Sequence, residues 1–205
     1  MVKDAQKLRE KIVDTAEELY LKHGVIAVSM DDIAHQLGIS KKTLYQVFSS
    51  KEELVKEAVQ RRFDKIVKAI EQFNIESKSP VEELVKIEDL MFENLQYQKE
   101  SPIYQLKRAF PDIAQWLLTQ LREYILNYLK DNIERGQREG IYKQEIDPEF
   151  TSRLFYASLI GSTEPEVFPV SKYSSANVSQ KILEFFMHAM LTEKGMELWK
   201  SISLD

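Results

Sequence analysis

The chain has no cysteine among its 205 residues, which excludes disulfide bonds and thiolate metal ligands. It also lacks any run near the roughly 18 uninterrupted apolar residues that a membrane-spanning helix needs, and Met1 to Asp4 lead into charged sequence without a signal-peptide core. Glycine and proline are scarce, with six of each, and they stand mostly at junctions between helical patterns. We therefore expect a cytoplasmic protein with no membrane partner, whose fold depends on packed helices.

Residue patterns for enzymatic chemistry are missing as well. The three histidines, His23, His35 and His188, are far apart and show no metal-ligand spacing. The chain offers no cysteine nucleophile, no glycine-rich phosphate loop and no serine in a nucleophile-elbow sequence. We therefore expect a protein that is not an enzyme and that has no metal site, no catalytic residue and no cofactor.

The charge of the chain is unevenly distributed. Its net charge is -5, yet residues 1–63 carry 11 Lys and Arg against 10 Asp and Glu, a net of +1. Residues 64–205 carry 17 against 23, a net of -6. Within Lys41–Lys51 there are three lysines and no acid. Such a local basic surface can meet phosphate on an acidic protein, although three lysines taken alone are more often a solvated helix face.

The amino-terminal residues predict two helices with defined ends. Apolar residues recur at helical spacing from Leu8 to Tyr20, and Gly24 is expected to end this first helix in a left-handed conformation. Ser29 is placed to cap a second helix, with Asp32 as its capping-box partner. The first 37 residues therefore contain one long helix and one short one.

A tight turn leads from the second helix into a third. Gly38-Ile39-Ser40 permits a sharp change of direction, and Ser40 caps the next helix. Leu44 and Val47 are expected to face inward, which leaves the outer face of Lys41–Phe48 exposed. A short, basic, rigidly held helix of this kind fits the major groove of DNA.

A fourth helix follows at once and is predicted to run to Phe73. Ser50 is its expected cap and Glu53 the capping-box partner, with Lys51 in the first turn. The backbone amides at this helix start, together with the lysine, form a candidate phosphate site.

At this point the sequence resembles the amino-terminal domain of TetR-family regulators over about residues 7–55. The resemblance is carried by Ser29-Met30-Asp31-Asp32-Ile33-Ala34, Leu37-Gly38-Ile39-Ser40, Thr43-Leu44-Tyr45 with Phe48, and Lys51-Glu52-Glu53-Leu54. It implies an all-α fold of about nine helices, with an amino-terminal three-helix helix-turn-helix domain joined to a carboxy-terminal helical ligand-binding and dimerisation bundle. The expected domains are residues 1–50 for DNA binding, 51–79 as connecting helix and linker, and 80–205 for effector binding and dimerisation.

The resemblance also implies which residues meet DNA. The expected contacts are Ser29, Ser40, Lys41, Lys42, Thr43, Tyr45, Gln46 and Lys51, with Tyr45 and Lys51 on phosphates. Lys42 stands where the family commonly has glycine, and Val47 where a histidine or aromatic is usual, so an operator sequence cannot be borrowed. Ser29, Ser40 and Thr43 also have a plain role in capping, and Tyr45 and Phe48 have one as core aromatics.

The rest of the chain predicts further helices separated by proline and glycine. These elements are a connector at 74–80, a fifth helix at 81–98, a short sixth from 101 to 110, a seventh from 112 toward 136 or 140, an eighth opening at 146–148, a loop at 164–175 and a last helix at 177–200. In the family the last two long helices form a four-helix interface with a second subunit. The residues expected at this interface are Phe155, Leu159, Ile182, Phe185, Phe186 and Met190, whose apolar surplus needs either the core or a partner.

The helices between residues 81 and 160 are expected to enclose a pocket for an effector. Candidate lining residues are Met91, Phe92, Tyr97, Tyr104, Phe110, Trp116 and Tyr156, which would suit an apolar or aromatic molecule. Large apolar residues at helical spacing are more often core filler than ligand contacts. The sequence does not name the effector.

Taken together, the resemblance predicts a sequence-specific transcriptional regulator that acts as a homodimer on a pseudo-palindromic double-stranded DNA operator. A repressor released from its operator by a small-molecule effector is the expected form. The alternative is an all-helical dimeric interaction module that keeps the helix-turn-helix shape without regulating by DNA binding.

Overall fold

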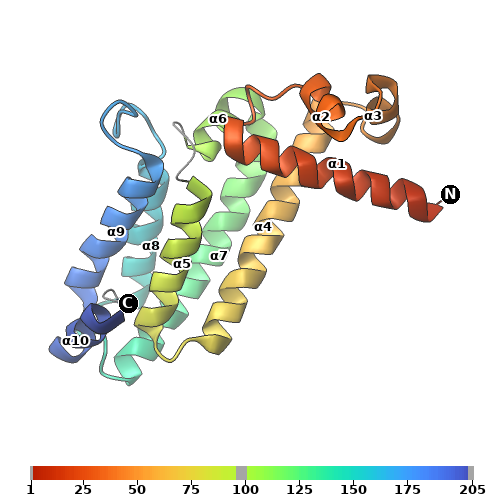
Figure 1. Ribbon diagram of the computed structural model, residues 1–205. Helices are drawn as coiled ribbons and strands as arrows, with labels where there is room; N and C mark the ends of the chain where they lie inside the picture. Colours follow the sequence, from red (N-terminus) through yellow and green to blue (C-terminus); the bar gives the residue numbers. More distant parts are fainter. Residues whose placement is uncertain (1, 96–100, 203–205) are drawn as a thin grey trace. The chain divides into compact units, whose positions relative to one another are not determined.

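The computed structural model describes residues 2–95 and 101–202, where helices are the only regular elements apart from one isolated β-bridge (Figure 1). The helices are α1 (Val2–His23), α2 (Met30–Leu37), α3 (Lys41–Val47), α4 (Lys51–Glu76), α5 (Pro80–Leu95), α6 (Pro102–Ala109), α7 (Pro111–Arg138), α8 (Pro148–Gly161), α9 (Ser175–Met190) and α10 (Glu193–Ile202). The all-α fold predicted from the sequence is confirmed. None of the described helices is both long and apolar enough to cross a membrane.

The chain divides into two compact units, each with its own apolar core. The described residues of 2–66 and 101–117 form the first unit, and those of 67–95 and 118–202 form the second. Helices α4 and α7 each contribute to both units. The segment 101–117, which the sequence interpretation assigns to effector binding, is thus part of the amino-terminal unit.

Helix α4 is longer than predicted. It ends at Glu76 instead of Phe73, because the Ser77 amide still donates to the Phe73 carbonyl at 2.8 Å. Asn74, which looks like a connector residue in the sequence, accepts a hydrogen bond of 3.1 Å from Arg135. The connector between α4 and α5 is therefore residues 77–79 and not 74–80.

Helix α1 contributes a buried apolar face to the core of the first unit and ends at a glycine. Ile12, Val13 and Ala16 of α1 are fully buried, as expected for apolar residues that repeat at helical spacing. Gly24 ends α1 with φ +83°, and its amide donates to the Tyr20 carbonyl at 2.9 Å. The left-handed cap predicted at this glycine is confirmed.

Residues from the middle of the chain complete this first core. Leu106 of α6 and Ile113 and Ala114 of α7 are almost fully buried in the same cluster as the α1 residues. A methyl group added at Gly24 would lie 2.5 Å from Oε1 of the buried Gln105, so α6 packs closely on the turn after α1. The core beneath the helix-turn-helix is therefore completed by residues outside the first fifty.

The second unit has a core between α5, α7 and α9. Val81, Ile133, Tyr142 and Met187 are fully buried there. Gly136 of α7 lies under the Tyr142 ring, because a methyl group added at Gly136 would come within 2.2 Å of Tyr142 Cδ2. Glycine is therefore favoured at position 136 because the Tyr142 ring packs directly on the backbone there, and not because the chain turns.

The single last helix predicted at 177–200 is wrong, because the chain forms α9 and α10 with a break between them. At the break Leu191 forms the isolated β-bridge with Tyr142, and the Lys143 amide donates to the Met190 carbonyl at 2.9 Å. Thr192 then caps α10, since its Oγ1 accepts from the Gly195 amide at 3.2 Å. These long-range bonds outweigh the helical pattern and raise the predicted nine helices to ten among the described residues.

A buried ion pair crosses the second unit. Glu83 is only 1% exposed and accepts hydrogen bonds from the Tyr128 hydroxyl and the Arg135 guanidinium. Beside it, Asn132 donates to the Pro80 carbonyl at 3.1 Å and accepts from the Tyr142 hydroxyl at 3.1 Å. A buried carboxylate needs such partners, so this network fixes the start of α5 against α7.

Candidate DNA interface

The helix-turn-helix begins with a complete capping box at Ser29. The Asp32 amide donates to Ser29 Oγ at 3.2 Å, and the Ser29 amide donates to Asp32 Oδ2 at 2.7 Å. The Ser29 hydroxyl also donates to the Asp32 carboxylate at 2.6 Å, and these bonds lower the pKa of Asp32. The box predicted from the sequence is confirmed, and it leaves Ser29 exposed at the start of α2.

The turn between α2 and α3 also follows the prediction. Gly38 has φ +64° and its amide donates to the His35 carbonyl at 3.1 Å, while the Ile39 amide donates to the Ala34 carbonyl at 3.0 Å. No heavy atom lies within 4 Å of a methyl group added at Gly38, so the left-handed backbone, and not a lack of space, favours glycine. The turn fixes the angle between the two helices.

Helix α3 has one buried and one exposed face. Ser40 caps the helix by accepting from the Thr43 amide at 3.0 Å, and the two hydroxyl oxygens lie 2.8 Å apart. Leu44 and the following Phe48 are fully buried in the first core, while Val47 is half-buried against it. Thr43 therefore takes part in capping, and Phe48 is a core residue. Both roles were offered in the sequence analysis as alternatives to a DNA contact.

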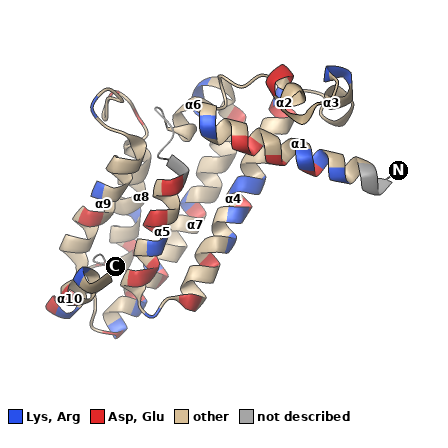
Figure 2. Ribbon diagram, in the orientation of Figure 1, with Lys and Arg blue, Asp and Glu red and all other residues tan. Residues whose placement is uncertain are grey.

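The exposed face of α3 consists of Lys41, Lys42, Tyr45 and Gln46. Tyr45 is 42% exposed, which is unusual for a large aromatic residue and supports a surface role over a core role. Lys41 forms an ion pair of 2.8 Å with the exposed Asp31 of α2, and this hydrogen-bonded partner raises the pKa of Lys41. Figure 2 shows the lysine pair at the start of α3 near the acidic first turn of α2.

Lys51 is placed differently from the other expected phosphate contacts. Its ammonium donates to the Val25 carbonyl at 2.7 Å and lies 5.9 Å from the centre of the Phe110 ring. Partial burial lowers the pKa of Lys51. The lysine thus ties α4 to the turn after α1, and its contact with phosphate stays a prediction.

The start of α4 departs from the prediction in one respect. Ser50 is the expected cap, since its hydroxyl accepts from the Glu53 amide at 3.1 Å. The Glu53 carboxylate, however, accepts from the amide and the hydroxyl of Ser49, each at 2.8 Å, in place of the Ser50 amide that a capping box requires. The carboxylate reaches one residue further back because it also forms an ion pair with Arg9 at 3.4 Å.

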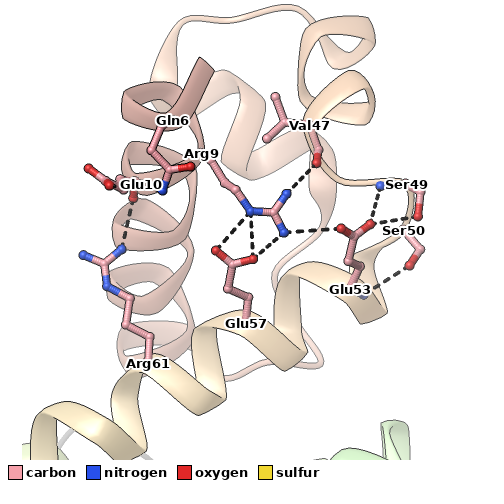
Figure 3. A network of polar contacts seen from close by, with 9 residues as sticks. All are labelled: Gln6, Arg9, Glu10, Val47, Ser49, Ser50, Glu53, Glu57 and Arg61. Atoms are coloured by element: carbon pink, nitrogen blue, oxygen red, sulfur yellow. Dashed lines mark hydrogen bonds and ion pairs between the residues drawn. The ribbon is translucent and has the colours of Figure 1, made fainter. Parts of the chain in front are cut away.

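Sequence reasoning missed the role of Arg9, which joins three helices (Figure 3). Its guanidinium donates to the Val47 carbonyl at the end of α3 at 3.0 Å and to both carboxylate oxygens of Glu57 on α4. The guanidinium carbon also lies 4.2 Å from the centre of the Phe48 ring. The only signal in the sequence is an arginine directly after Leu8, the first residue of the apolar stripe of α1, and it predicts no partner by itself.

Two of the six residues expected at the dimer interface lie in the core instead. Phe186 is 4% exposed and Met190 is 1% exposed within a single chain, because both pack on the α5 side of α9. Phe185 is 69% exposed, and Phe155, Leu159 and Ile182 are half-buried. A place at the dimer interface therefore stays a prediction for Phe155, Leu159, Ile182 and Phe185. Phe186 and Met190 belong to the core of the single chain.

The residues expected to line an effector pocket belong to both units. Tyr104, Phe110 and Trp116 lie in the first unit, where Phe110 packs on the core and Trp116 meets the edge of Phe63 at 6.1 Å. Met91, Phe92 and Tyr156 are half-buried in the second unit, and Tyr156 donates to the Leu118 carbonyl at 3.2 Å. Tyr97 lies outside the described residues. The pocket itself stays a prediction.

Metal chemistry finds no support in the described ranges, where no group of three or more His, Asp or Glu side chains is placed to hold an ion. The functional geometry is instead the short turn, the capped α3 and its exposed face.

This geometry coincides with a known sequence family, because residues 12–58 match the family described as bacterial regulatory proteins, tetR family. Residues 12–58 are thus the DNA-binding domain of a TetR-family transcriptional regulator. Transcriptional regulation by DNA binding is the function of the chain, and its relatives are regulators, not enzymes.

Two relatives and one solved structure extend the TetR-family likeness beyond the first unit. The chain is 28% identical over 184 residues to the uncharacterized HTH-type transcriptional regulator YhgD of Bacillus subtilis, covering 85% of this chain and 92% of that protein. It is 24% identical over 149 residues to the HTH-type transcriptional repressor KstR2 of Mycolicibacterium smegmatis, covering 71% and 73%. Its fold is similar to that of a transcriptional regulator from Saccharomonospora viridis in complex with choline, with TM-score 0.69, 19% identity, and 92% and 100% of the two chains covered.

The capping box at Ser29 predicts how the stability of this TetR-family regulator depends on pH. The pKa of Asp32 is lowered in the folded protein, so its stabilising effect is present above its ordinary pKa of 3.8 and is lost as the pH falls through the lower folded value. Asp32→Asn should therefore lower the Tm at about pH 7, and the difference from wild type should shrink as the pH falls below 3.8, to about pH 3. Thermal unfolding by circular dichroism measures both.

Glu18→Gln, at an exposed position in the second half of α1, is the matched control for loss of a carboxylate. It should leave the Tm close to wild type at both pH values. A Tm difference for Asp32→Asn that is the same at both pH values would contradict the capping role of the charge.

Proposed function

We propose that the exposed face of α3 enters the major groove of an operator and that Gln46 reads a base there. An α-helix with its side chains is about 10–12 Å across, which fits a groove about 12 Å wide. Because Leu44 and Phe48 are buried, the face that carries Lys42, Tyr45 and Gln46 is the one left for DNA. This one-sided burial is the observation that carries the proposal.

The proposed contacts divide into positioning and reading. Lys42 and Tyr45 are exposed and can reach phosphates, and Ser29 and Ser40 bring helix starts, with their amides, to the DNA backbone. The amide of Gln46 can both donate to and accept from an adenine edge. Lys41 must leave Asp31 to meet DNA, so we expect a smaller net contribution from it than from Lys42.

The operator is proposed to be pseudo-palindromic because one short helix contacts too few base pairs for useful specificity. A homodimer would supply the second helix. Phe150, Leu154 and Phe185 on α8 and α9 are 63%, 46% and 69% exposed, and α8 and α9 pack side by side (Figure 1). Adjacent exposed aromatic and aliphatic side chains support a subunit interface there.

The regulator is proposed to repress and to leave its operator when an apolar or aromatic effector binds. One structural neighbour holds choline, a small organic molecule, and one relative is a repressor. Leu106, Ile113 and Ala114 belong to the DNA-binding core although they come from the middle of the chain. A ligand that displaces this segment would therefore disturb the packing beneath the helix-turn-helix.

Binding to DNA can be tested with an operator selected from a random duplex library by the full-length protein. If two subunits each neutralise about three phosphates, log affinity should fall with log salt at a slope of about -5. Gln46→Ala should weaken the selected operator by about 1–3 kcal/mol, leave random DNA nearly unchanged and relax the preference at one base per half-site. Fluorescence anisotropy gives the affinities.

Gln36→Ala, at an exposed position on α2, is the control for loss of a surface glutamine amide. It should bind both duplexes as wild type does. A flat salt dependence and no selected sequence would favour the interaction module, and equal losses on both duplexes for Gln46→Ala would place this residue on the DNA backbone.

The dimer proposal predicts about twice 24.0 kDa in sedimentation at micromolar concentration. Phe185→Glu should raise the dimer Kd by about tenfold or more, because burial of a phenylalanine contributes about 1.5–3 kcal/mol, and operator affinity should fall with it. Ile75→Glu, at a position 77% exposed near the end of α4, should change neither. A wild-type monomer, or equal effects of the two variants, would remove this interface.

A further inference from the structure

The carbonyl group of Val47, at the end of α3, has no hydrogen-bond donor within the helix itself. The helix has seven residues, and the last turn of any helix leaves carbonyl groups without a helical partner. The Phe48 amide satisfies the Leu44 carbonyl at 3.0 Å, but the Val47 carbonyl must find a donor elsewhere. It finds the Arg9 guanidinium of α1 at 3.0 Å (Figure 3).

We propose that Arg9 is a positioning residue that sets the orientation of α3 and thereby the discrimination between operator and random DNA. The inference rests on the proposed role of α3 in reading bases. Arg9 touches no DNA in this account, and it acts through the carbonyl at the end of the reading helix.

The geometry of the guanidinium suits this task. One terminal nitrogen donates to Val47, and Nε donates to Glu57 with 2.9 Å between Nε and Oε2. The other terminal nitrogen donates to Glu57 and, at 3.4 Å, to Glu53. The guanidinium carbon lies over the Phe48 ring, 4.2 Å from its centre. A rigid fork with several donors can hold a backbone carbonyl and a carboxylate at once, which a lysine ammonium on a flexible stem does not match.

Glu53 of α4 binds Ser49, which follows the end of α3. Its carboxylate accepts from Ser49 at 2.8 Å and pairs with Arg9 at 3.4 Å. The Ser49 hydrogen bonds, and then the Arg9 contact, lower the pKa of Glu53. The backbone from Val47 to Ser49 is therefore bound to α1 and α4 through one ionic network.

The same network argues against Arg9 as a phosphate contact. The side chain is 32% exposed, but two carboxylates, Glu53 and Glu57, already surround its single positive charge. A phosphate would meet a local charge of about -1 from these three groups. Loss of Arg9 should therefore leave the salt dependence of DNA binding unchanged.

Arg61 provides a matched control for a merely structural ion pair. It is 33% exposed and also joins α4 to α1, through Asp14 at 2.6 Å and the Glu10 carbonyl at 3.4 Å. Figure 3 shows both arginines between the same two helices, but no contact joins Arg61 to α3. Arg9→Gln and Arg61→Gln thus each remove an ion pair between α1 and α4. Only Arg9→Gln also removes the hydrogen bond to the carbonyl at the end of α3.

The experiment compares wild type, Arg9→Gln, Arg9→Lys and Arg61→Gln as full-length proteins. Each is measured by thermal unfolding and by anisotropy on the selected operator and on random duplex over a range of salt. Arg9→Gln should lower the affinity for the selected operator about tenfold, which is the equivalent of one hydrogen bond to a charged group. Its affinity for random DNA should fall by less than about twofold. Its salt slope should equal that of wild type, and Arg9→Lys should not restore the operator affinity.

Arg61→Gln should lower the Tm to a similar extent and keep operator affinity within about twofold of wild type. Equal operator losses for the two arginine variants would overturn the proposal, and so would a shallower salt slope for Arg9→Gln, which would show a phosphate contact. If Arg9→Gln does not fold, Glu57→Gln weakens the same network from α4 and should show the same split between operator and random DNA. A wild-type protein that selects no sequence would overturn the proposed function and this inference with it.

Discussion

Burial of Leu44 and Phe48 beneath α3 is the contact on which the surface proposed to face DNA depends. Seven residues do not hold a helix in water by themselves, so α3 exists because its inner face is packed. Each fully buried apolar side chain contributes about 1.5–3 kcal/mol, more than the exposed ion pair between Lys41 and Asp31 can. Once that face is fixed, the positions of Tyr45 and Gln46 on the outside follow from helical geometry.

The packing beneath α3 also ties DNA binding to the middle of the chain. Leu106 and Ile113 belong to the same core as Leu44, and Lys51 spans from α4 to the Val25 carbonyl beside the Phe110 ring. The helix-turn-helix is thus a surface of a larger unit. Residues of segment 101–117 therefore share one packed core with the helix-turn-helix.

Local chemistry was readable from the sequence, whereas long-range partners were not. The caps at Ser29, Gly38 and Ser40 need only neighbours within four residues, and the structure has them as predicted. The break between α9 and α10 depends on residues about fifty positions away, and the pattern of α9 gives no hint of it. Likewise Phe186 and Phe185 are adjacent apolar residues in the sequence, and only the packing of α9 tells the core residue from the exposed one.

We propose that the surface that meets DNA is centred on the exposed face of α3. A photo-crosslinking amino acid placed at Tyr45, and in a second protein at Phe150, tests it directly on the selected operator. We expect a covalent adduct with DNA from position 45 and none from position 150. Adducts from position 150 with none from position 45 would contradict it.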